Sequence, residues 1–166
     1  DLDEEGGRHA LSQALSFLRR HLPEGVLVTR GAEEVGVDPA RVRSDVHTFR
    51  RALEAEEWGE AVAHYHGELL DGLHVAGAAP FTDWVGRERE RLREAAAAAA
   101  WQDAHGLIAR GYLVEAERAG QVALRLVPTD ESAVRTFIEA LAAGGDRAAA
   151  LRFYSKFAEI LVQELD

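Results

Sequence analysis

The opening of the chain combines an amphipathic helical pattern with a short strand–turn–strand pattern. Between residues 9 and 22, apolar side chains recur every three or four positions, whereas the opposite side of the expected helix is polar and basic. Pro23 ends this helix, because proline lacks the backbone N–H that another turn would need. β-branched residues on either side of Arg30 and Gly31 then predict a hairpin that turns at this pair.

The rest of the chain has a helical pattern. Residues 45–57 and 58–70 predict an antiparallel helix pair, which an apolar loop at 71–80 follows. A long helix is expected from about Phe81 to Arg110, and its segment "WVGRERERLRE" predicts a solvated face with charge pairs along the helix. The six alanines Ala95–Ala100 predict a tight packing surface, because alanine lets a neighbouring helix approach closely.

A repeat of 34 residues marks the second half of the chain, since this distance separates Gly111 from Gly145 and Ala116 from Ala150. Helix pairs of this length are typical of tetratricopeptide-like arrays. In this register Tyr154 is expected to fill the seam of the last pair, and Tyr154→Ala to cost roughly 3–5 kcal/mol of stability. We predict a mainly α fold: a tetratricopeptide-like antiparallel helical array, preceded by an N-terminal helix and a short β-hairpin. The buried stripe of the last pair's first helix is expected to consist of Val134, Phe137, Ile138 and Leu141.

Composition indicates a soluble, cytoplasmic protein. The 166 residues are 47% hydrophobic and include no cysteine. We find neither a signal-peptide pattern nor an apolar run near the roughly 20 residues of a membrane helix, so no membrane association is expected. The net charge of −10 opposes nucleic-acid binding by the chain as a whole. Residues 8–43, however, carry six arginines against four acids.

Catalytic and metal-binding patterns are absent from the sequence. There is no glycine-rich phosphate loop, no zinc-protease motif and no nucleophile elbow. His64 and His66 are two positions apart, so on a helix they point in different directions and cannot share a metal. We therefore expect no enzyme activity, no catalytic residue, no metal and no cofactor.

Four segments in order resemble a known family: "HALSQALSFLRRHL", "VDPARVRSDVHTFRRAL", "AVAHYHGELLDG" and "DWVGRERERLRE". With the repeats behind them, they are similar to the bacterial transcriptional activator domain of SARP-type antibiotic-regulatory activators. The resemblance implies an all-helical regulatory domain at residues 44–166 that follows a winged-helix DNA-binding domain. Residues 1–43 would be the C-terminal part of that winged helix, its third helix and wing, without the strands and first two helices.

DNA-contacting residues are expected on the polar face of the first helix and at the hairpin tip. Short hydrogen-bonding side chains and arginines over about three turns can reach both base edges and phosphates. By chemistry alone, an ordinary solvated face is the alternative interpretation. The family's helix carries a basic residue where this chain has Phe17, so Arg19 and Arg20 are the cations that the resemblance carries over. The expected DNA-binding residues are Ser12, Gln13, Ser16, Arg19, Arg20 and Arg30.

A partner-binding groove is expected on the first helices of the two repeats, which build the concave wall of such arrays. Trp101 stands out there, because an indole is too large for a seam that six alanines keep tight. The alternative is that Trp101 covers the neck of the 71–80 loop. In either case we expect one face of Trp101 to pack on protein, with its N–H turned to the groove or to a backbone acceptor. The expected groove residues are Trp101, Gln102, His105, Arg135, Thr136 and Glu139.

Two functions from different classes remain open. The first is a transcriptional activator domain that binds its own DNA-binding domain, a second protomer in a homodimer, or the transcription machinery. The alternative is a self-contained tetratricopeptide scaffold that binds a peptide or a partner protein without DNA.

The chain by itself is predicted to bind duplex DNA weakly and without sequence preference. Residues 8–43 supply a net charge of only +2, so the dissociation constant should be about 10⁻⁴–10⁻⁶ M or weaker. Fluorescence anisotropy with labelled duplexes at physiological salt measures this. Nanomolar, sequence-selective binding would contradict an incomplete winged helix.

Overall fold

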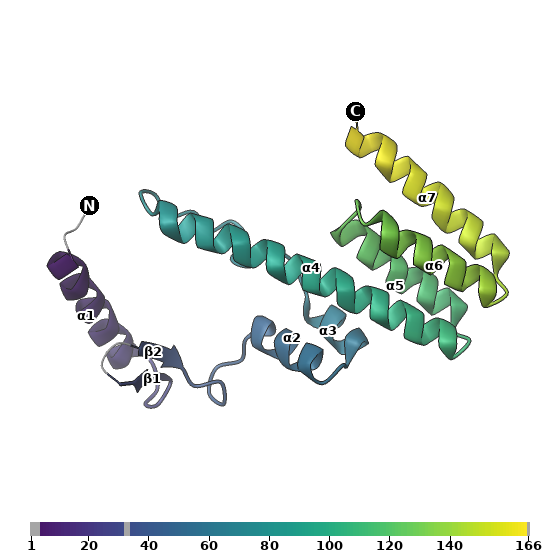
Figure 1. Ribbon diagram of the computed structural model, residues 1–166. Helices are drawn as coiled ribbons and strands as arrows, with labels where there is room; N and C mark the ends of the chain where they lie inside the picture. Colours follow the sequence, from purple (N-terminus) through teal and green to yellow (C-terminus); the bar gives the residue numbers. More distant parts are fainter. Residues whose placement is uncertain (1–3, 32–33, 166) are drawn as a thin grey trace. The chain divides into compact units, whose positions relative to one another are not determined.

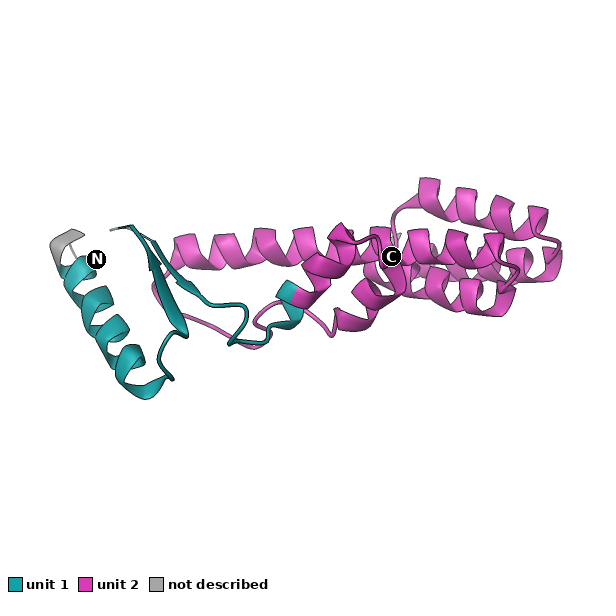
Figure 2. Cartoon of the chain, turned by 90° about the horizontal axis from the view of Figure 1, so that it is seen from below, with its two compact units in different colours: residues 1–47 teal, residues 48–166 magenta. Residues whose placement is uncertain are grey.

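The computed structural model describes residues 4–31 and 34–165 and divides into two units, residues 1–47 and 48–166 (Figure 2). The described residues form seven helices and one small sheet, which confirms the predicted mainly α fold. The elements are α1 (Glu4–His21), β1 (Leu27–Arg30), β2 (Glu34–Val37), α2 (Asp45–Glu54), α3 (Trp58–His64), α4 (Ala79–Ala109), α5 (Leu113–Leu126), α6 (Glu131–Ala143) and α7 (Arg147–Leu165) (Figure 1).

The first unit contains the expected helix followed by the expected hairpin. Strands β1 and β2 pair antiparallel, with Leu27 opposite Val37 and Arg30 opposite Glu34. Gly31 follows β1 with a φ of 67°, a left-handed conformation that glycine adopts without steric cost. Helix α1 begins at Glu4, five residues before the expected helical pattern starts at residue 9.

The core of the second unit forms where α4 packs against α3, α5 and α6, and α7 covers α6. Four residues of the alanine run are buried, which confirms its role as a packing surface: Ala96, Ala97, Ala99 and Ala100. Between α4, α6 and α7 lie three aromatic rings. The ring of Phe137 is 5.3 Å from that of Trp101 and 4.8 Å from that of Phe153, measured between centroids.

The 34-residue repeat corresponds to a repeated backbone conformation at the two interhelical turns. Gly111 and Gly145 both have positive φ, 82° and 99°, at the turn between the helices of a pair. In each turn the glycine amide donates to a carbonyl three residues back, at 2.9 Å in the first and 3.2 Å in the second. The following amide donates to a carbonyl five residues back, at 2.9 and 3.2 Å. This closing pattern satisfies carbonyls at the helix end, so α4–α5 and α6–α7 are two copies of one motif.

The charged segment of α4 binds other parts of the second unit, which the sequence did not predict. Arg89 donates from Nε to the Leu69 carbonyl at 2.7 Å and from a terminal nitrogen to the Leu70 carbonyl at 2.8 Å. Glu88 accepts from Arg50 of α2 and Arg91, and the Arg91 hydrogen bond contributes most to a pKa of Glu88 below its usual value. The segment therefore binds the loop at Leu69 and Leu70 and helix α2, and it does not only face solvent.

Two expectations need correction. The helix expected at 58–70 ends at His64, because Tyr65 is extended and the chain then turns into the loop that α4 binds. Tyr154 does not fill the seam of the last pair: its side chain is 58% exposed, whereas the neighbouring Phe153 is 1% exposed. The buried face of α7 runs through Ala149, Ala150, Phe153 and Phe157, and one residue further along a helix is a rotation of about 100°.

The seam of the α6–α7 pair is predicted to depend on Phe153 and not on Tyr154. Phe153→Ala should lower the free energy of unfolding by about 3–5 kcal/mol, because it leaves a cavity beside Phe137. Tyr154→Ala, on the exposed face, should change it by less than about 0.5 kcal/mol. Urea denaturation followed by circular dichroism measures both, and equal losses would contradict this packing.

Candidate protein-binding groove

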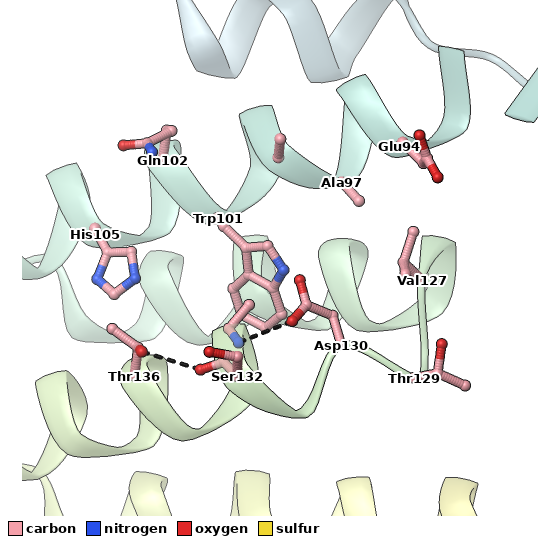
Figure 3. Close-up of a pocket in the computed structure, with 12 residues that line it drawn as sticks. Glu94, Ala97, Trp101, Gln102, His105, Val127, Thr129, Asp130, Ser132 and Thr136 are labelled. Atoms are coloured by element: carbon pink, nitrogen blue, oxygen red, sulfur yellow. Dashed lines mark hydrogen bonds between the residues drawn. The ribbon is translucent and has the colours of Figure 1, made fainter. Parts of the chain in front are cut away.

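A groove of about 650 Å³ lies between α4 and the start of α6 (Figure 3). The α4 wall extends from Glu94 to His105, and the α6 wall from Ser132 to Thr136. The segment that leads from α5 into α6 closes one end of the groove. The lining consists of Glu94, Ala97, Ala98, Trp101, Gln102, His105, Val127, Thr129, Asp130, Ser132, Ala133 and Thr136.

The start of α6 is fixed by a helix cap. Asp130 precedes the helix, and its carboxylate accepts a hydrogen bond from the Ala133 amide at 3.0 Å. Such a cap satisfies one of the amides that a helix leaves free at its first turn. One turn further, the Thr136 hydroxyl donates to the Ser132 carbonyl at 3.0 Å. The carboxylate of Asp130 is therefore held at the groove by the same contact that begins the helix.

Trp101 is the largest side chain in the lining, and it belongs to the core as well. The residue is 6% exposed, and its ring packs against Phe137 and Phe153. In Figure 3 the indole extends from α4 toward the start of α6, with its nitrogen edge turned to the Asp130 end of the groove. The Nε1 atom is buried and has no hydrogen-bond partner among the described residues. An N–H without an acceptor in such a place is unfavourable, because burial has removed its water.

The charged side chains of the lining are acidic. The two carboxylates are Glu94 and Asp130, and neither lysine nor arginine is among the lining residues of the described chain. His105 is the one imidazole of this lining, and its ring stands edge-on to Phe137 at 5.9 Å. The remaining polar groups are amide and hydroxyl groups, which suit hydrogen bonds to a polypeptide backbone.

The structure brings four of the six expected groove residues together: Trp101, Gln102, His105 and Thr136 line the groove. Arg135 and Glu139 are exposed on α6 but are not part of the lining. Glu94 and Asp130 also line the groove, and neither was predicted from the sequence. An aspartate between Thr129 and the apolar periodicity of α6 is a helix-start signal, and it could have identified Asp130.

The expected DNA-contacting residues all lie in the first unit, and all are exposed. Five are on α1, where the Arg20 guanidinium donates to the Ser16 carbonyl at 3.3 Å and Gln13 is 2.9 Å from the His9 ring nitrogen. Arg30 is at the end of β1, next to the turn. The apolar face of α1 is also open to solvent, because Leu11 is 59% exposed and Leu18 39%.

Within residues 4–31 and 34–165, no three histidine, aspartate or glutamate side chains gather closely enough to hold a metal ion. None of the helices in the described part of the chain is long and apolar enough to cross a membrane.

The fold places the chain among helical-repeat proteins, whose stacked helix pairs create concave surfaces. The profile of the bacterial transcriptional activator domain matches residues 33–166, and the chain belongs to this family. The family is one of transcriptional activators and not of enzymes. A search of characterised proteins and a search of solved structures each gave no significant match.

Trp101 is predicted to contribute to stability through its ring and to reduce stability through its N–H. Trp101→Ala should lower the free energy of unfolding by about 3–5 kcal/mol, because the cluster loses its packing. The loss of unfolding free energy in Trp101→Phe should be smaller than in Trp101→Ala by about 1 kcal/mol or more, because phenylalanine retains a ring and removes the unsatisfied donor. Urea denaturation of both variants tests this. Equal losses would contradict the combined gain expected from retaining a ring and removing the unsatisfied donor.

Proposed function

We propose that the chain is the protein-binding, regulatory part of a bacterial transcriptional activator. The observation that supports this most is the groove between α4 and α6, where a buried indole N–H has no acceptor within the described part of the chain. A partner seated in the groove would supply that acceptor. The partner is a protein: the chain's own DNA-binding domain, a second protomer or a component of the transcription machinery. A regulator of this kind acts at the chromosome, in the bacterial cytoplasm.

We further propose that the first unit belongs to a winged-helix DNA-binding domain. The order of helix and hairpin supports this, as does the apolar face of α1, whose Leu11, Leu18 and Leu22 are exposed. Helices of the winged-helix domain would cover this face. DNA contact is assigned to the opposite face and the hairpin tip, at Ser12, Gln13, Ser16, Arg19, Arg20 and Arg30.

Activation is testable with the full chain fused to a DNA-binding domain of known operator, in a bacterium that carries a transcription reporter. Transcription should rise above the level that the DNA-binding domain alone gives. Ala98→Arg should return it to that level, because Ala98 is an exposed residue of the groove lining and arginine would fill the space. The matched control is Ala148→Arg on α7, an exposed alanine outside the lining.

Three outcomes would contradict the proposal. A fusion that never activates would favour the scaffold that acts without DNA. Equal loss in both arginine variants would indicate general damage to the helical array. Activation that persists in Ala98→Arg would place the partner site elsewhere.

A further inference from the structure

The groove has a charge and a hydrogen-bonding capacity that restrict what can occupy it. We propose that it binds an extended peptide segment carrying an arginine or lysine side chain. This inference rests on the proposed function, because it specifies the chemistry of the partner that the groove takes. The supporting features are the two carboxylates, the unsatisfied indole N–H and the length of the walls.

The carboxylates select a cation. Glu94 is exposed on the α4 wall and has no ion pair among the described residues. Asp130 uses one carboxylate oxygen to cap α6, at 3.0 Å from the Ala133 amide, which leaves its second oxygen for a ligand. No lysine or arginine of the described lining competes for either carboxylate. A guanidinium or ammonium group would form charge-assisted hydrogen bonds here, which are about twice as strong as neutral ones.

The indole selects an acceptor. Trp101 is more than nine-tenths buried, and its Nε1 donor has no partner among the described residues. A carbonyl oxygen of the ligand would complete this bond and remove the penalty of the unsatisfied group. One ligand must therefore offer both a cation and a nearby carbonyl. A basic residue within a polypeptide offers both, because each residue carries a backbone carbonyl.

The dimensions suit a short extended segment. From Glu94 to His105 the α4 wall advances eleven residues, or about 16 Å at 1.5 Å per residue. An extended peptide advances about 3.3 Å per residue, so the wall accommodates about five residues. The hydroxyls of Thr129 and Ser132 and the amide of Gln102 are available to its backbone. The Thr136 hydroxyl donates to the Ser132 carbonyl and can still accept a hydrogen bond. Phosphate groups and acidic peptides are excluded, because the same carboxylates repel them.

The test begins with a phage-displayed library of random dodecapeptides, selected on the full chain. The selected peptides should be enriched in arginine and lysine relative to the library. The strongest binder is then synthesised and titrated into the Trp58→Phe/Trp84→Phe double variant, whose one remaining tryptophan is Trp101. The fluorescence of Trp101 should change when the peptide binds. The affinity for the peptide should fall as the sodium chloride concentration is raised, since salt screens an exposed ion pair.

The charge variants are chosen to leave the fold intact. Glu94→Gln preserves side-chain length, and Asp130→Asn retains a side chain that caps helices as well as aspartate does. Each variant should bind the synthetic peptide about tenfold more weakly, because it loses one charge-assisted hydrogen bond. Trp101→Phe should also weaken it, by removing the indole donor. Glu115→Gln makes the same charge change at an exposed position of α5 outside the lining, and it should leave the affinity unchanged.

The possible results separate this inference from the proposed function. Selected peptides that lack basic residues, or unchanged affinity in both charge variants, would overturn the basic-peptide inference. The proposed function would still stand if Ala98→Arg abolished reporter activation. Conversely, a basic peptide that binds as expected while the fusion fails to activate would support the inference and contradict the regulatory role. A library that yields no binder at all would also overturn the inference.

Discussion

Phe137 rests directly on the backbone of α5 at Gly120, and the packing of the last four helices depends on that contact. A Cβ atom at Gly120 would lie 2.6 Å from Cε1 of the Phe137 ring, closer than any real contact. The absence of a side chain there lets α6 approach α5. The same ring then meets Trp101 from α4 and Phe153 from α7, at 5.3 and 4.8 Å. Four helices therefore converge on one aromatic side chain.

This cluster also determines where the groove can be. Because the indole of Trp101 is held by Phe137 and Phe153, it cannot rotate to find an acceptor for its N–H without breaking core contacts. Two features of this residue have opposite energetic effects: its ring stabilises the array, and its N–H donor is unfavourable because it has no acceptor among the described residues. A buried donor without an acceptor among the described residues, at the wall of a groove, supports the proposed binding function.

The sequence predicted those features that depend on spacing. The 34-residue period placed both interhelical turns, and the alanine run identified the packing face of α4. It did not distinguish Tyr154 from Phe153, because both are aromatic and a one-residue error in register exchanges a buried position for an exposed one. The acidic character of the groove could not be predicted either. Glu94 and Asp130 are 36 positions apart in the sequence, and only the packing of α6 on α4 brings them to one cavity.

Helix α4 is a single rod of 31 residues, about 46 Å long at 1.5 Å per residue. Its second half forms the groove, whereas its first half holds α2 through the ion pair of Arg50 and Glu88. A straight helix does not absorb a small tilt along its length; it converts the tilt into displacement at its far end. A rotation of about 5° about the middle of the groove wall, which is about 30 Å from Ala79 at 1.5 Å per residue, would move that end by about 2.6 Å. The length of α4 thus gives the second unit a lever arm between the groove and α2.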